Sequence, residues 1–131
     1  MNEIELAQKM IMKFFQGTLK ENFTSEQKEI LKTVFQKVKI EYGDMPEEIE
    51  EDSGEYDREE EKIIISSEHG NEMYYIQTLL HEYGHALSNF DFYKTGIHIN
   101  PIIEEGMVEL FKDLVIDFNN DIDIEPCDTY K

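Results

Sequence analysis

Four stretches of the chain carry apolar residues at intervals of three and four, the spacing that gathers them on one face of a helix. We therefore predict helices over about residues 1–17, 24–38, 72–88 and 102–118. Thr24 and Gln27 have the spacing of a capping box, Asn71 suits a helix N-cap, and Pro101 suits a helix start. Local chemistry thus supports the beginnings of three of these helices.

Short β-branched stretches predict two strands. Residues 62–66 are the clearer case, because they are bounded by charge, and we expect them to form the edge strand of a small sheet. The free backbone groups of an edge strand could pair with an extended peptide. Residues 39–42 predict another strand, which ends at Gly43. With 131 residues and no internal repeat, the chain is expected to form a single α+β domain over residues 1–131.

The chain is strongly acidic, with 30 Asp and Glu against 12 Lys and Arg and a net charge of −18. Such a surface repels nucleic acid and anionic membranes, and it attracts cationic peptides or a basic partner protein. Eleven of the acidic residues fall within residues 44–61, where we expect an exposed, mobile loop. This loop could flank a cleft and select basic side chains, or it could simply be solvated. The net charge of the whole chain could likewise serve solubility alone.

The sequence also lacks the signals of an exported or membrane-spanning protein. No apolar run approaches the roughly 18 residues of a membrane-spanning helix. Residues 1–17 carry charged residues among the apolar ones, which is typical of an amphipathic helix rather than a secretion signal. The single cysteine, Cys127, cannot form an intramolecular disulfide and fits a reducing compartment. We therefore expect a cytoplasmic protein.

The third predicted helix contains the pattern His81-Glu82-Tyr83-Gly84-His85. Histidines four positions apart lie on one face of a helix, one turn apart, so both imidazoles can reach a single ion. Glu82 lies next to that face and can reach a water bound to the same ion. Two nitrogen ligands and a general base are the arrangement of a zinc hydrolase. Gly84 is costly in a helix interior, which indicates that something packs closely against it.

A catalytic zinc ion needs a third protein ligand and one open position. Glu104 and Glu105 in the fourth predicted helix compete for this role, and only one can face the ion because they point about 100° apart. Glu105 has Glu109 one turn further on, where a carboxylate can accept a hydrogen bond from the far nitrogen of a ligating histidine. Glu104 has Val108 at the same offset. We therefore favour Glu105 as the ligand and Glu109 as the supporting carboxylate. The alternative for Glu104 and Glu109 is a solvated helix face.

These motifs resemble those of the gluzincin clan of metallopeptidases, in which HExxH is followed by Glu-Gly and an apolar helix with another acid one turn later. The resemblance covers about residues 54–116 and implies a zincin-like fold, with an edge strand that leads into the active-site helix. It also implies that Glu105, just before Gly106, is the third zinc ligand. The later acid corresponds to Glu109, although thermolysin-like members have aspartate there. In size the chain is similar to single-domain minimal gluzincins.

The expected activity is zinc-dependent hydrolysis of a peptide bond, with one catalytic Zn²⁺ held by His81, His85 and Glu105. The ion lowers the pKa of its water toward about 7, and Glu82 takes that proton and later delivers it to the leaving amine. The developing oxyanion needs a second donor beside the metal. Candidates for this donor are Tyr93, His98 and Tyr130. The substrate would be a peptide or protein, and the acidic surface favours a basic one.

Two other functions stay open. The chain could be a zincin-fold binding or regulatory module with a structural metal, although Glu82 would then serve little purpose. It could also be a narrow-specificity processing protease of a toxin, phage or immunity system.

The tail, residues 119–131, contains Cys127, whose thiolate is a strong zinc ligand. This tail either fills the cleft and keeps the enzyme latent, or it is a loose end with an incidental cysteine. The oligomeric state also stays open.

Overall fold

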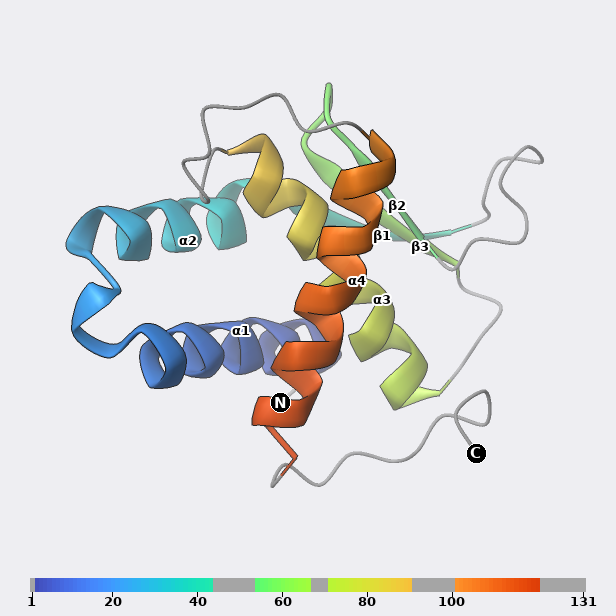
Figure 1. Ribbon diagram of the computed structural model, residues 1–131. Helices are drawn as coiled ribbons and strands as arrows, with labels where there is room; N and C mark the ends of the chain where they lie inside the picture. The colour runs from blue at the N-terminus through green and yellow to red at the C-terminus, as the bar shows by residue number, and fades with distance from the viewer. Residues whose placement is uncertain (1, 44–53, 67–70, 91–100, 121–131) are drawn as a thin grey trace.

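The computed structural model describes residues 2–43, 54–66, 71–90 and 101–120, with the side chains of residues 101–103 excepted. This part of the chain forms α-helices, a short 3-10 helix and strands (Figure 1). In chain order these are α1 (Glu3–Leu19), η1 (Lys20–Asn22), α2 (Ser25–Lys37), β1 (Lys39–Gly43), β2 (Gly54–Asp57), β3 (Lys62–Ser66), α3 (Glu72–Asn89) and α4 (Pro101–Phe118). The α+β class predicted from the sequence is confirmed.

Side-chain caps fix where the helices begin. Thr24 and Gln27 form the predicted capping box at the start of α2, with both reciprocal hydrogen bonds at 3.1 Å. Asn71 caps α3 by accepting hydrogen bonds from two backbone N–H groups of the first turn. The predicted helices over residues 72–88 and 102–118 agree with α3 and α4 to within one residue at each end.

The three strands form one mixed sheet in the order β1-β3-β2. β3 pairs with β1 in parallel and with β2 antiparallel, so that Ile63 lies opposite Ile40 on one side and Tyr56 on the other. Residues 62–66 therefore form the central strand, and the prediction that they lie at the edge is wrong. Ile63 and Ile65 are fully buried, because α3 packs against this strand. The charged residues around β3 mark its ends and not an exposed edge.

Part of the acidic segment predicted as a mobile loop is a strand. Within residues 44–61, Gly54–Asp57 forms β2 and residues 58–61 form the turn into β3, while residues 44–53 lie outside the described residues. Oδ1 of Asp57 stabilises the turn by accepting hydrogen bonds from the backbone N–H groups of Glu59 (3.0 Å) and Glu60 (3.1 Å). Tyr56 is the one apolar residue of β2, so this strand lacks the β-branched run that normally predicts one.

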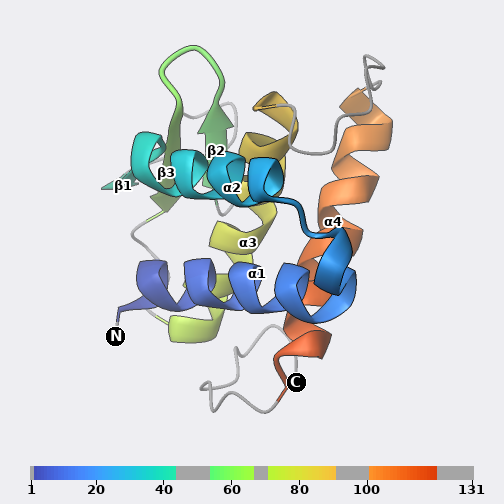
Figure 2. The same ribbon diagram turned by 90° about the vertical axis from the view of Figure 1, so that its left-hand side faces the viewer.

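Helix α3 is central to the fold. It packs against α1, α4, β2 and β3, and Ile76, Leu80 and Leu87 on this helix are fully buried. Figure 2 shows α1 and α2 in front of α3, with α4 at one side. The phenol oxygen of the buried Tyr83 accepts a hydrogen bond from Gln8 of α1 (2.9 Å).

Among the helices described, none is both long and apolar enough to cross a membrane.

Helices α3 and α4 approach each other closely at Gly84. A Cβ atom at this position would lie 2.9 Å from Cβ and Cγ1 of Val108 and 3.4 Å from Cδ2 of Phe111 in α4. The glycine therefore lets α4 lie directly against α3, which is the close packing that the sequence predicts. At Gly106 of α4, by contrast, an added Cβ would meet nothing within 4 Å.

We predict that Gly84→Ala is less stable than Gly106→Ala by about 1–3 kcal/mol, the usual cost of overpacking. Alanine favours a helix over glycine by about 1 kcal/mol at either position, so this gain cancels when the two variants are compared. The remaining difference in the free energy of unfolding reports the contact between α3 and α4. Urea unfolding of the two zinc-free variants, followed by circular dichroism, measures it. Equal stabilities would show that Val108 moves aside at little cost.

Candidate metal centre

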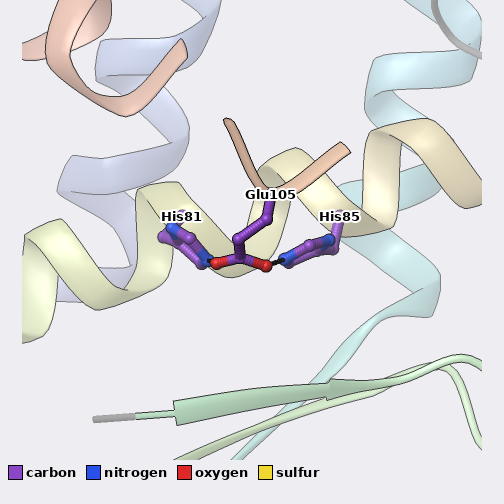
Figure 3. A group of neighbouring side chains, drawn as sticks. All are labelled: His81, His85 and Glu105. Atoms are coloured by element: carbon purple, nitrogen blue, oxygen red, sulfur yellow. Dashed lines mark hydrogen bonds and ion pairs between the residues drawn. The ribbon is translucent and has the colours of Figure 1, made fainter. Parts of the chain in front are cut away.

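Two histidines on one face of α3 begin the site. His81 and His85 lie one helical turn apart, their ring centroids are 5.0 Å apart, and both side chains are mostly buried. Their Nε2 atoms turn toward one carboxylate from α4 (Figure 3). The spacing of the two histidines in the sequence therefore places both rings where one ligand atom or ion could meet them.

Glu105 of α4 lies between the two imidazole rings (Figure 3). Its Oε1 is 2.7 Å from Nε2 of His81, and its Oε2 is 3.1 Å from Nε2 of His85. One donor atom from each of the three residues lies within 4.8 Å of the other two. The Glu105 side chain is 56% exposed, so the group is accessible from solvent. These three residues could hold one metal ion.

Glu104, the other candidate ligand, lies behind His85 and not between the rings. Its Oε2 is 2.9 Å from Nδ1 of His85, and its Oε1 accepts a hydrogen bond from the Ser88 hydroxyl (2.6 Å). The guanidinium of Arg58, in the turn after β2, also donates to Oε2. Only 10% of the Glu104 side chain is exposed, so its interpretation as part of a solvated helix face is wrong.

Glu109 takes the corresponding place behind His81. Its Oε1 lies 2.5 Å from the buried Nδ1 of His81, although the two atoms are not aligned as a hydrogen bond. Its Oε2 accepts a hydrogen bond from Nζ of Lys112 (2.9 Å), and the Lys112 side chain is only 8% exposed. Each histidine therefore has its own carboxylate at Nδ1, and the two histidines share Glu105 at Nε2.

The surroundings favour the ionised forms of both carboxylates behind the histidines. Burial raises the pKa of Glu104, but the hydrogen bonds that it accepts outweigh burial and bring the pKa below the ordinary value of a glutamate. Burial also raises the pKa of Glu109, and its contacts with Lys112 and His81 again bring the net pKa below the ordinary value. An ionised carboxylate can only accept a hydrogen bond, so it favours a proton on Nδ1 and leaves the Nε2 lone pair for a metal.

Glu82, the expected general base, is buried next to β2. A Cβ atom on Gly54 of this strand would lie 2.6 Å from Cγ2 of Thr78 and 3.5 Å from Cγ of Glu82. The missing side chain at Gly54 therefore lets β2 pass close to α3. Among the strands that the structure describes, β2 is an outer one, so Glu82 lies next to an edge of this sheet.

Arg58, Ser88 and Lys112 belong to no sequence motif that predicts a role at this site. Ser88 lies three positions after His85 in the same helix, and this local spacing was the one signal that could have indicated it. Arg58 contacts a residue 46 positions away, which no local pattern reveals. The remaining candidates, Tyr93, His98, Cys127 and Tyr130, lie outside the described residues.

In comparisons with family models, with curated proteins and with solved structures, no match to this chain reaches significance.

We predict that Glu105→Ala weakens zinc binding by more than the roughly 10- to 100-fold that is typical of losing an outer-shell partner. Asp117→Ala is the matched control, because it removes one exposed carboxylate from the same helix. Native mass spectrometry gives the zinc stoichiometry, and competition with a chelator gives the affinity. If both variants lose affinity equally, Glu105 acts only through its charge and is not a ligand.

Proposed function

We propose that the protein is a zinc-dependent metallopeptidase that hydrolyses peptide bonds. The observation that carries this proposal is the convergence of the Nε2 atoms of His81 and His85 on the Glu105 carboxylate. Glu82 follows His81 directly in the same helix. Two imidazoles and one carboxylate are the ligand set of a catalytic zinc site, which keeps a further position for water or substrate.

The donor chemistry fits zinc better than the harder divalent ions. Calcium and magnesium prefer oxygen ligands, whereas imidazole nitrogens suit zinc. Within the part of the chain that the structure describes, the donor group has three members, and closed structural zinc sites usually have four protein ligands. The ligand number therefore favours a catalytic ion over the structural metal of a binding or regulatory module.

The residues around the site have separate roles in the proposed reaction. When bound, zinc would lower the pKa of a water molecule toward about 7 and polarise the substrate carbonyl. His81 and His85 would bind through Nε2. Glu104 lies within hydrogen-bond distance of Nδ1 of His85, and Glu109 lies against Nδ1 of His81. Glu82 would accept the proton of the attacking water and pass it to the leaving amine.

An extended peptide is the substrate that this arrangement favours. The outer edge of β2 pairs with no other strand among the described residues, and β2 passes next to Glu82. Backbone N–H and C=O groups at a sheet edge can pair with an extended peptide. We therefore assign to β2 the peptide-binding role that the sequence suggests for residues 62–66.

A zincin-like fold is part of the same proposal. It is supported by the order of the elements, in which a small sheet precedes a helix with the HExxH pattern and a later helix supplies the carboxylates. A narrow-specificity processing protease would use the same chemistry and differ only in its substrate.

We predict that Glu82→Gln keeps zinc at near wild-type affinity but slows peptide cleavage by about 10²- to 10⁴-fold, the usual contribution of a general base. The assay uses zinc-loaded protein and a pool of unstructured peptides rich in lysine and arginine, with products identified by mass spectrometry. Chelation should abolish cleavage by the wild-type protein, and added zinc should restore it.

The control is Glu72→Gln, which makes the same change at an exposed position in the first turn of α3. Cleavage by this variant should match the wild type. A wild-type protein that binds one zinc ion but cleaves none of the peptides would instead support the binding module. Loss of zinc in Glu82→Gln would make Glu82 a ligand and contradict its role as the base.

A further inference from the structure

Each candidate metal-binding histidine is supported by the same series of contacts, from Nδ1 to a carboxylate and from the carboxylate to a cation. For His85 the carboxylate is Glu104 and the cation is Arg58. For His81 the carboxylate is Glu109 and the cation is Lys112. Carboxylates that contact metal-binding histidines are common in proteins. The two cations have no role in the reaction proposed above.

Arg58 reaches Glu104 from a distant part of the chain. It is the only arginine in the sequence, and it lies in the turn between β2 and β3. Its guanidinium donates to Oε2 of Glu104, the same oxygen that contacts Nδ1 of His85. The Arg58 side chain is 53% exposed and that of Glu104 is 10% exposed. Replacing Arg58 would therefore remove a partner of a buried carboxylate without leaving a cavity in the core.

The position of Glu104 explains why it needs a cation. It lines a groove on α4 whose other lining residues are apolar, apart from Ser88. The neighbouring Glu105 carries the same charge, so Glu104 is both partly desolvated and repelled. A carboxylate in such a place is costly unless hydrogen bonds and an opposite charge satisfy it. Ser88 supplies a hydrogen bond at Oε1, and Arg58 supplies the charge at Oε2.

We propose that Arg58 is a positioning residue of the metal site, which acts through Glu104 to hold Nε2 of His85 toward the ion. The inference rests on the zinc site of the proposed function. The carboxylate that Arg58 fixes accepts a hydrogen bond from the Nδ1–H group of His85, which leaves the Nε2 lone pair for the metal and restricts rotation of the ring. Lys112 has the matching place on the side of His81.

Simple charge repulsion predicts the opposite effect. Arg58 is a positive charge near the zinc site, so its removal would strengthen zinc binding if Coulomb repulsion were its only influence. If Arg58 positions His85, its removal weakens zinc binding instead. The sign of the change in zinc affinity therefore distinguishes the two effects.

The first test is the zinc affinity of Arg58→Met in the full chain, measured by competition with a chelator. Methionine keeps an aliphatic side chain but removes the guanidinium. We expect the affinity to fall, but by no more than the roughly 10- to 100-fold that is typical of losing an outer partner of a metal ligand such as Glu104, with partial recovery in Arg58→Lys. Lys62→Met is the control. It removes a cation of the same hairpin that pairs with Glu60 (2.7 Å) and Glu41 (3.5 Å), so the affinity should not change.

Two further measurements test whether Arg58 acts through Glu104. The double variant Arg58→Met/Glu104→Gln should bind zinc no more weakly than Glu104→Gln alone, because both changes interrupt one series of contacts. In the zinc-loaded protein, nitrogen-15 spectra should show faster water exchange of the His85 Nδ1 proton in Arg58→Met, with His81 unchanged. General destabilisation would affect both histidines.

Unchanged or tighter zinc binding by Arg58→Met would overturn this inference and leave the proposed zinc site in place. Additive losses in the double variant would also overturn it, because Arg58 would then act by another route. A wild-type protein that binds no zinc would overturn both the proposed function and the role of Arg58. The zinc titration of the wild-type protein therefore tests whether the metal site exists, and the titration of Arg58→Met tests whether Arg58 positions His85.

Discussion

The close contact between α3 and α4 at Gly84 is the constraint on which the proposed site depends. Gly84 lies between the two histidines in the sequence, and Val108, which it faces, lies between Glu105 and Glu109. The contact between Gly84 and Val108 therefore places Glu105 on one side of the contact and Glu109 on the other. A larger residue at position 84 would separate the helices, and the α4 glutamates would no longer lie 2.5–3.1 Å from the imidazole nitrogens.

Charge within the site links metal binding to the packing of α4. Three carboxylates of one helix lie against two imidazoles in a chain with a net charge of −18. Packing against α3 partly removes these carboxylates from water, which strengthens their mutual repulsion and so opposes the contact between α3 and α4. Arg58 and Lys112 offset part of it, because each pairs with a different carboxylate. A divalent cation between the histidines would offset more, so zinc would stabilise the same helix contact that builds its site.

The parts of the fold that could be predicted are those determined by neighbouring residues. Periodicity and caps predict α3 and α4 to within one residue, and the spacing of His81 and His85 places both rings on one face. β2 is missed because its pairing partner β3, and not its own composition, makes it a strand. Because the acidic segment gives no sign of β2, the sequence predicts only one neighbour for β3 and therefore an edge strand. The place of Glu104 depends on Arg58, 46 positions away, which local patterns cannot show.

Because β2 and not β3 is the outer strand, the acidic residues that would lie beside a bound peptide are those of β2. β2 is the outer strand next to Glu82, and alternate residues of a strand point to opposite faces. Tyr56 is buried, so Glu55 and Asp57 lie on the other face of β2. Asp57 accepts hydrogen bonds within the turn into β3, so Glu55 is the acidic residue of β2 itself that a peptide paired with this edge would meet. A preference for basic substrates would then arise from the binding strand itself, and the net charge of the chain would add only a long-range attraction.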